Sequence, residues 1–387
     1  MKRERQGRLH TTLTLGEAVE AFVPSPLPPS PSIDWTTELQ VQFAKANRAL
    51  GGLDQVSSLL PNPALFIYTY IRKEAVLSSQ IEGTQSSLSD LLSYEAGGHP
   101  GVPLDDVEEV SCYVAALNHG LERIRSGFPL SNRLFKEIHR KLLGSGRGSN
   151  KLPGEFRRSQ NWIGGTRPGN AHFVPPPPEA LAECMGGLEK FLHGEPAQTP
   201  TLVKAALVHL QFETIHPFLD GNGRLGRLLI TLLLCAEGVL KEPLLYLSLF
   251  FKTHRTTYYQ MLDQVRQDGD WEAWLSFFAE AVTSTAEQAT TTARALFMLV
   301  DKHQEQILLA RPKMKNSLSL LFPIIARKLV VTSESLVNDS ELTPATVNAC
   351  LRALTEQGII EETTGKKRGR VFCYTACLEL LDRGLEK

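Results

Sequence analysis

The chain has 387 residues and a formal net charge of −1; 42% of its residues are hydrophobic and 21% are charged. This length allows two or three domains with sizeable cores, and the composition is that of an ordinary soluble globular protein. The near-neutral charge excludes a whole-chain attraction to nucleic acid or membrane, so any basic patch has to be local.

We expect a cytoplasmic protein without a membrane partner. The basic N-terminus is followed by no apolar stretch of signal-peptide type. The most apolar run, Leu228–Cys235, is far too short to span a bilayer. The six cysteines form no CxxC pair and no zinc-like Cys/His spacing, so we expect buried, reduced thiols at Cys112, Cys184, Cys235, Cys350, Cys373 and Cys377.

The N-terminal third begins with a segment that cannot be helical. Residues 1–33 contain the run Pro-Ser-Pro-Leu-Pro-Pro-Ser-Pro, which predicts an extended arm. Asp34 is expected to cap a helix over residues 35–50, which the pair Gly51–Gly52 would end. A second helix is predicted from near Pro63, because apolar residues follow at helical spacing through Leu77.

The middle of the chain is mostly helical. One stretch breaks the helical rhythm: residues 161–178 read NWIGGTRPGNAHFVPPPP, which predicts a hairpin or flap. The sequence therefore indicates a mainly α body with one β-flap. Helical periodicity recurs over residues 105–124, 132–143, 179–192, 200–214, 223–237, 247–265 and 271–310.

The tail has a different pattern. Thr343 and Pro344 predict a helix start, and Gly358 is expected to end that helix after Gln357. Two alternating segments, 359–362 and 370–374, then predict strands joined by a basic turn. Helix followed by a basic-tipped hairpin indicates a winged helix-turn-helix over residues 316–387, after a linker between 310 and 316. The turn carries Lys366, Lys367, Arg368 and Arg370, which would contact DNA phosphates or form a solvated turn on a protein-docking module.

One twelve-residue segment concentrates chemistry: His216-Pro-Phe-Leu-Asp-Gly-Asn-Gly-Arg-Leu-Gly-Arg227, between two helical patterns. The turn Gly221-Asn222-Gly223 presents N–H groups at the start of the second helix, which makes an anion site suited to phosphate. Arg224 and Arg227 are three residues apart, so both can lie on one helical face near that anion.

The same segment supplies a metal ligand and a base. Asp220 can hold Mg²⁺, which prefers carboxylate, water and phosphate oxygens. His216 is the side chain there that can accept a proton near neutral pH. A base, a carboxylate, an anion site and two arginines within twelve residues are typical of a functional site.

Other readings of the segment fail. Gly221-x-Gly223-x-x-Gly226 matches the dinucleotide-binding fingerprint, but that fingerprint needs a preceding strand, and the preceding segment is helical. The chain contains no GxxxxGK[ST] motif. His209 and His216 lack the HExxH spacing of a zinc protease.

The segment resembles the motif of the Fic family, HxFx(D/E)GNGRxxR. The resemblance extends through the flap, residues 246–274 and the tail, and so covers most of the chain beyond the arm. It implies a mostly α fold: an N-terminal helical region with an inhibitory helix (34–125), a Fic catalytic domain (126–312) and the small C-terminal winged domain. Every specified position of the motif matches: His216, Phe218, Asp220, Gly221, Asn222, Gly223, Arg224 and Arg227.

The resemblance implies an adenylyltransferase that uses ATP and Mg²⁺. His216 would deprotonate a Ser, Thr or Tyr hydroxyl of a target protein, which attacks the α-phosphate while pyrophosphate leaves. Asp220 would place Mg²⁺ between the α- and β-phosphates, and Tyr259 is the candidate for the adenine pocket. The expected nucleotide-binding residues are Gly221, Asn222, Gly223, Arg224, Leu225, Gly226, Arg227 and Tyr259, with the two arginines on the β- and γ-phosphates.

The flap resembles the family's target-docking hairpin, to which a target segment adds as a further strand. An ordinary surface loop is the alternative. The expected docking residues are Trp162, Ile163, Gly164, His172 and Phe173.

An upstream match suggests regulation. The segment Ser78-Ser-Gln-Ile-Glu-Gly83 resembles the family's inhibitory pattern [ST]xxxE[GN]. The resemblance implies that Glu82 pairs with Arg227, so that ATP binds unproductively until Glu82 moves. A helix end with a solvated glutamate is the alternative.

Three functions are therefore carried forward. The first is AMP transfer to a target protein. The second stays within the family: transfer of another phosphate-containing group, or removal of AMP with Glu82 positioning water. The third is a DNA-binding regulator that only senses nucleotide, against which the intact His216 argues. The sequence leaves open whether the tail binds DNA and whether the chain forms a homodimer.

Overall fold

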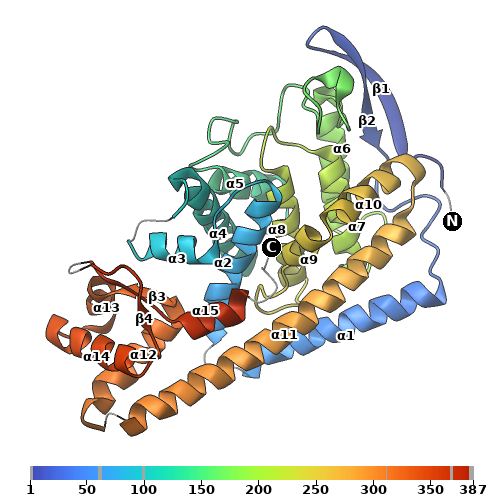
Figure 1. Ribbon diagram of the computed structural model, residues 1–387. Coiled ribbons are helices and arrows are strands. Elements are labelled where there is room, and N and C mark those ends of the chain that lie inside the picture. Colours follow the sequence, from blue (N-terminus) through green and yellow to red (C-terminus); the bar gives the residue numbers. More distant parts are fainter. Residues whose placement is uncertain (1–2, 60–62, 98–100, 311, 367–368, 383–387) are drawn as a thin grey trace.

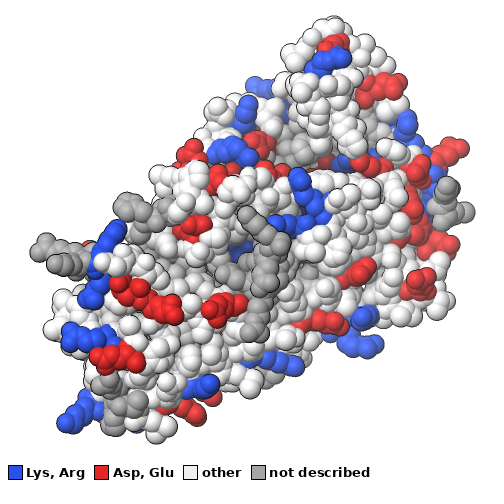
Figure 2. All heavy atoms as spheres, in the orientation of Figure 1, with Lys and Arg blue, Asp and Glu red and all other residues white. Residues whose placement is uncertain are grey.

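The computed structural model describes residues 3–59, 63–97, 101–310, 312–366 and 369–382, and it confirms the mostly α fold. Two helices run side by side along one edge of the molecule (Figure 1): α1 (Thr37–Leu59) and the 40-residue α11 (Trp271–Ala310). Figure 2 shows acidic and basic side chains intermixed over one face, in keeping with the net charge of −1.

Helix α1 differs from its prediction at both ends. Thr36, not Asp34, caps it, since the Leu39 N–H donates to Thr36 Oγ1 over 3.2 Å. Gly51 and Gly52 do not end it, although a glycine inside a helix costs about 1 kcal/mol relative to alanine. The helix continues because its later residues Leu53 and Val56 are buried in the core, and such packing outweighs local propensity.

The body around the motif consists of packed helices. Helix α7 is buried along its whole length from Leu202 to Ile215, including its charged residues Lys204 and Glu213. The predicted single helix over 247–265 is two helices, α9 and α10, which meet at His254 because its ring nitrogen bonds back to the Phe250 carbonyl (3.0 Å). The body helices are α2 (Pro63–Ile81), α3 (Leu88–Glu95), α4 (Leu104–Arg125), α5 (Asn132–Leu142), α6 (Pro178–Leu192), α7 (Thr201–Ile215), α8 (Asn222–Ala236), α9 (Ser248–Thr253) and α10 (Arg255–Asp268).

The N-terminal arm is more ordered than predicted. It contains an antiparallel hairpin of β1 (Gly7–Thr14) and β2 (Glu17–Pro24), which projects from the body in Figure 1. Leu15 and Gly16 both have positive φ, as a tight two-residue hairpin turn requires. The arm was predicted as extended without mention of a hairpin, and residues 7–24 form paired strands because the proline run begins only at Pro24.

The C-terminal module, residues 315–382, contains more elements than predicted. The predicted helix and two strands are present, with Thr343 capping α14 through the Thr346 N–H (3.3 Å), but the strands are shorter than expected. The predicted linker is a 3-10 turn (Pro312–Met314) that leads directly into α12, and Lys367 and Arg368 lie outside the described residues. The elements are α12 (Lys315–Lys328), β3 (Val330–Thr332), α13 (Ser333–Ser340), α14 (Pro344–Glu356), β4 (Glu361–Glu362), β5 (Val371–Cys373) and α15 (Thr375–Asp382), with strand order β3-β5-β4, all antiparallel.

One hydrophobic core joins the module to the body. A single cluster of buried side chains extends from Leu27 in the arm to Leu381 in α15. Helix α2 packs against α12, and the Lys73 ammonium of α2 donates to the Leu381 carbonyl over 2.6 Å. The helix that carries the expected inhibitory glutamate therefore also contacts the C-terminal module.

None of the described helices is long and apolar enough to cross a membrane. None of the six cysteines forms a disulfide. Burial was predicted for all six, which is right for Cys350, Cys373 and Cys377 and wrong for the partly exposed Cys112, Cys184 and Cys235.

Candidate active site

His216 follows directly after α7 in a strained backbone conformation. Its φ of 50° and ψ of 60° are left-handed, which is unfavourable for a residue with a Cβ and is typical of functional positions. Its N–H still bonds to the Phe212 carbonyl of α7 (2.9 Å). Its Nδ1 lies 3.4 Å from the Glu213 carbonyl, the acceptor that holds a proton on Nδ1 and leaves Nε2 able to accept one.

The surroundings of His216 keep the imidazole neutral. Burial, together with the positive charges of Arg266 and Arg157, lowers the pKa of His216 to about 4. A general base has to be unprotonated before it acts. The side chain is therefore in the form that accepts a proton.

The loop after His216 is closed by Asn222. Its side chain accepts from the Phe218 N–H (2.8 Å) and donates to the Phe218 carbonyl (2.9 Å). The side chain predicted to hold phosphate is thus committed to shaping the loop. The first N–H groups of α8 have no side-chain cap among the described residues, so the backbone there is the part of the motif suited to an anion.

His139 of α5 fixes Asp220 from below the loop. Its Nδ1 accepts from the Gly154 N–H (2.8 Å), so its Nε2 carries the proton that is donated to the Asp220 carbonyl (2.9 Å). Its ring stacks on Phe218 with centroids 3.7 Å apart. Burial lowers the pKa of His139 to about 4, which keeps this tautomer neutral.

The donor set at Asp220 fits Mg²⁺. Its side chain is about a third exposed, and a Cβ at Gly148 would lie 2.9 Å from its Oδ2, so glycine keeps space open beside that oxygen. No cluster of three or more His, Cys, Asp or Glu ligands occurs among the described residues. One carboxylate with water and phosphate oxygens is the usual magnesium arrangement, whereas a dedicated protein cage is not.

The two motif arginines have different partners. Arg224 is fully buried, 2.7 Å from Glu109 of α4 and 3.3 Å from Asp220. Burial raises the pKa of Glu109, and the charges of Arg224 and Arg147 only partly offset this effect. The expectation that Arg224 and Arg227 face one anion together is therefore not met here, since Arg224 is held by Glu109.

Arg227 binds the predicted inhibitory segment. It donates to Ser78 Oγ and to the Ser78 carbonyl (2.9 Å each) and to Glu82 Oε1 (2.8 Å). Gly83 has a φ of 103°, which explains the glycine at this position. The exposed Arg147 also donates to the Glu82 carbonyl (3.0 Å). The alternative of a solvated glutamate is wrong.

The Glu82 carboxylate stays ionised. Burial alone would raise its pKa, but the charge of Arg227 and the hydrogen bond from it outweigh burial, so the net shift is downward. The pair is therefore ionic at neutral pH.

A second carboxyl group lies behind Arg227. Burial raises the pKa of Glu213 to about 7, against the opposing charge of Arg227, and its Oε1 has no hydrogen-bond partner among the described residues. A Cβ at Gly226 would lie 2.3 Å from that oxygen, so Gly226 admits the Glu213 side chain. Leu225 is fully buried, so neither of these two motif positions presents a side chain to a ligand.

Tyr259 lies at the edge of the site. It is 38% exposed, and Arg255 lies 5.5 Å from its ring centroid. The core tyrosine of this helix is instead Tyr258, which is buried and bonded to His209 (2.9 Å). Tyr259 is thus free to stack on a base, as its prediction requires.

The predicted flap residues come together beside α10. Ile163 and Phe173 form a β-bridge at the flap's neck, Gly164 has a φ of 68°, and His172 lies 2.6 Å from Asp263. Trp162 packs against the N-terminal hairpin, whose Phe22 N–H donates to the Val174 carbonyl (2.8 Å). The flap is therefore an ordered hairpin braced by the arm.

The site also contains residues that the sequence did not reveal. Each lies outside the motif and acts through a fold contact, and none carries a local signal beyond helical periodicity or a glycine-rich loop. They are Glu109, His139, Arg147, Arg157, Asn161, Glu213 and Arg266.

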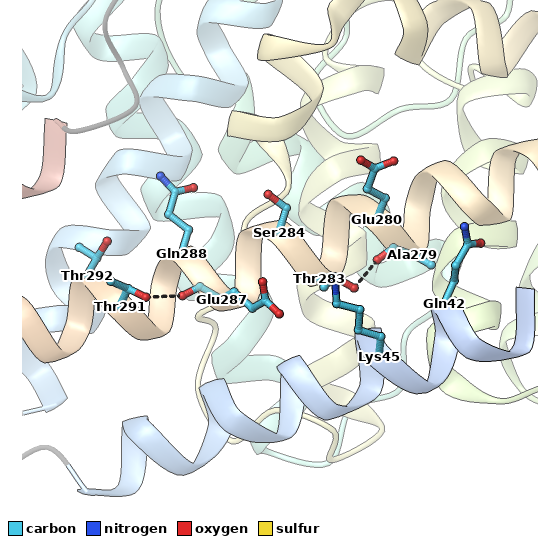
Figure 3. Close-up of a pocket in the computed structure, with 10 residues that line it drawn as sticks. All are labelled: Gln42, Lys45, Ala279, Glu280, Thr283, Ser284, Glu287, Gln288, Thr291 and Thr292. Atoms are coloured by element: carbon cyan, nitrogen blue, oxygen red, sulfur yellow. Dashed lines mark hydrogen bonds between the residues drawn. The ribbon is translucent and has the colours of Figure 1, made fainter. Parts of the chain in front are cut away.

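A groove between α1 and α11 lies away from the motif. It encloses about 760 Å³ between Gln42 and Lys45 of α1 and polar side chains of α11, including Glu280 and Glu287 (Figure 3). It contains no motif residue.

Comparison with known proteins shows similarity to one family over two parts of the chain. The Fic/DOC family N-terminal region matches residues 41–122, and the Fic/DOC family matches residues 129–234. A Protein adenylyltransferase Fic of Aedes aegypti is 38% identical over 152 residues, which is 39% of this chain and 27% of that protein. The Drosophila melanogaster protein of the same name is 36% identical over 152 residues, covering 39% and 28%.

A solved structure shares the fold. A Fic family protein from Desulfovibrio desulfuricans G20 aligns with a TM-score of 0.57 and 20% identity, over 90% of this chain and 98% of that chain. This likeness shows the fold alone. The chain spans little more than a quarter of the length of the two curated relatives, at 27% and 28%.

Proposed function

We propose that the chain is a member of the Fic/DOC family, whose models match residues 41–122 and 129–234, and that it transfers AMP from ATP to a Ser, Thr or Tyr hydroxyl of a target protein. The observation that supports this most is a half-buried, neutral His216 at the start of the loop that leads to a helix N-terminus suited to phosphate. The curated relatives bear the name protein adenylyltransferase.

In this reaction the target hydroxyl oxygen attacks the α-phosphorus and pyrophosphate leaves. His216 Nε2 accepts the hydroxyl proton, and the first N–H groups of α8 stabilise phosphate charge. Asp220 would hold Mg²⁺, which supplies charge neutralisation between phosphates when bound. Tyr259 lies where it can contact the adenine, and the flap is the proposed docking edge for the target backbone.

Inhibition by Glu82 is part of the proposal. Of the two motif arginines, Arg224 is bound to Glu109, and Arg227 is bound to Glu82. Glu82 therefore takes a position that a phosphate would need in order to contact Arg227. A γ-phosphate would have to displace this carboxylate or bind in another position. We expect the protein as it stands to be nearly silent.

The test uses ATP labelled on the α-phosphate, with Mg²⁺ and a cell lysate as source of targets. Glu82→Gly is expected to label protein strongly, because Arg227 becomes free, and the wild type is expected to label weakly. Glu82→Gly/His216→Ala is the matched control and should lose the label. Equal labelling by wild type and Glu82→Gly would refute inhibition but keep transfer.

The reverse chemistry is the second candidate. Glu82 is ionised and lies beside the site, as a carboxylate that orients water must. Pre-labelled lysate incubated with wild type would lose label if AMP removal were the activity. No transfer in any variant combined with such loss would favour this alternative.

For the C-terminal module we propose a winged helix-turn-helix, on the order α13, α14 and the β4–β5 hairpin. Lys366 and Arg370 line a groove of about 920 Å³ with Ser93 and Gly97 beside α3. Charges of both signs occupy the face seen in Figure 2, which favours docking of a protein over a broad electrostatic grip on duplex DNA. Salt-dependent binding of a labelled duplex would overturn this preference.

A further inference from the structure

Arg157 lies between the catalytic loop and the flap. Its side chain is buried, with the residue 2% exposed, and it belongs to the segment that leads from α5 into the flap. Its Nε donates to the His216 carbonyl (3.0 Å), and its Nη2 donates to the Pro176 carbonyl (2.5 Å) and to Ile215 (3.4 Å). Its own N–H donates to the Pro217 carbonyl (2.9 Å).

This arrangement is costly for packing alone. A buried cation requires compensation, which is usually a carboxylate, and none lies within ion-pair distance of Arg157 among the described residues. Burial lowers the pKa of Arg157 to about 10. Its hydrogen bonds among the described residues go to backbone carbonyls, and the charge of Glu179 favours the cation without an ion pair, so the side chain serves to hold the segments that it bonds to.

We propose that Arg157 is a positioning residue that fixes His216 in its left-handed turn and keeps it in register with the flap. The inference rests on the proposed AMP transfer, in which the flap holds the target and His216 deprotonates it. Pro176 ends the flap and His216 begins the loop, and the one guanidinium bonds to both. Asn161, at the start of the flap, contacts the same loop, because its side-chain amide donates to the Phe218 carbonyl (3.0 Å).

The backbone strain explains why a clamp is needed. A left-handed residue with a Cβ is disfavoured, and it persists only where its surroundings determine it. Without the donor to its carbonyl, His216 can relax and carry its ring away from the hydroxyl. A displacement of about 1 Å from the reactive position costs on the order of a hundredfold in rate.

The experiment compares Arg157→Gln and Arg157→Lys in the Glu82→Gly background. Arg157→Gln is expected to lower kcat for AMP transfer about 100-fold. The KM for ATP should change little, because the phosphate site at α8 does not involve Arg157. Arg157→Lys keeps a buried donor and should recover part of kcat. Rates are expressed per folded molecule, from thermal unfolding of each variant.

The matched control is Arg3→Gln. Arg3 is also a buried arginine that donates to backbone carbonyls, those of Pro31 and Ser32, but it ties the arm to Glu272 of α11. Its replacement is expected to lower the unfolding temperature and to leave kcat per folded molecule unchanged. Equal losses of kcat in both variants would overturn a specific role of Arg157.

A pH profile separates the role from mere packing. The charges that act on His216 are those of Arg266, Arg157 and Glu82. In the Glu82→Gly background, Arg157→Gln removes a cation that lowers the pKa of His216, so that pKa should rise. The acid limb of kcat/KM should therefore move to higher pH, whereas Arg157→Lys keeps the cation and should not move it.

Two outcomes are decisive. A kcat for Arg157→Gln within about twofold of its parent would overturn the positioning role. A Glu82→Gly parent that labels nothing would instead refute the proposed function, so the two failures are distinguishable.

Discussion

At the scale of single residues, burial and neighbouring charges set the protonation state of each group in the site. His216 is kept neutral between two arginines, whereas Glu82 is kept ionised by a third. The chemistry therefore depends less on which residues are present than on which of them the fold leaves unpaired. The Nε2 of His216 can accept a proton, whereas the Nε and Nη2 of Arg227 are bonded to Ser78 and Glu82.

The titration of His216 is the first prediction at this scale. Because its pKa is about 4, the ring should stay neutral from pH 8 down to about pH 5. Between about pH 4 and the usual value near 6.5, the unfolded chain binds a proton there that the folded chain does not, so this group lowers stability as the pH falls. Imidazole NMR of the wild type, assigned with His216→Gln, measures it; a ring that titrates near 6.5 would contradict it.

Ser78 supplies the second prediction. Ser78→Ala removes one acceptor of Arg227 but leaves Glu82 in place. Since a hydrogen bond to a charged group contributes about 1.5–3 kcal/mol, the basal transfer rate should rise roughly tenfold, still below that of Glu82→Gly. Ser79→Ala is the control, because Ser79 Oγ is buried without a partner among the described residues. An increase in both variants would point to general loosening of α2.

The motif residues were predictable because their chemistry is local to twelve positions. The contact of Glu82 with Arg227 was predictable only through the family resemblance, since 145 residues separate the two. Glu109 and His139 were not predictable. Each acts through a partner that only packing brings near, and a lone glutamate or histidine on a helix gives no indication of that partner.

At the scale of elements, the errors of the sequence analysis have different causes. The glycine pair in α1 was judged by local propensity, but tertiary burial decided the outcome. The break at the exposed His254 instead coincides with a local bond from its ring to the Phe250 carbonyl. The β1–β2 hairpin was not predicted, because the proline run indicated an extended arm for all of residues 1–33. The helices with clear periodicity, such as α5 and α6, were placed within a residue or two.

Helical glycines provide a stability test. Gly51 and Gly52 have open space where a Cβ would stand, so Gly51→Ala/Gly52→Ala should raise the free energy of unfolding by about 1–2 kcal/mol. Gly120→Ala in α4 is the counterpart, because its Cβ would lie 2.8 Å from Leu232 Cδ1, and it should be destabilising. Urea unfolding measures both; the same sign for both changes would refute the packing argument.

At the scale of the whole molecule, the continuous core predicts one unfolding unit. Phe322→Ala, in α12, should lower stability by about 3–5 kcal/mol. All four tryptophans, Trp35, Trp162, Trp271 and Trp274, lie in the body or its arm, so their fluorescence reports unfolding there. We expect their transition to shift together with circular dichroism. Leu320→Ala, on the exposed side of α12, should shift neither, and an unmoved tryptophan transition in Phe322→Ala would indicate independent modules.

The placement of α2 has a thermodynamic consequence. One end of this helix contacts α12 and α15, and the other end carries the segment that occupies Arg227. Any molecule that binds the C-terminal module better in one position of α2 therefore changes the affinity for ATP. By linkage, ATP changes the affinity for that molecule by the same factor. The ATP concentration would then change how tightly the C-terminal module binds that molecule, even before any AMP is transferred.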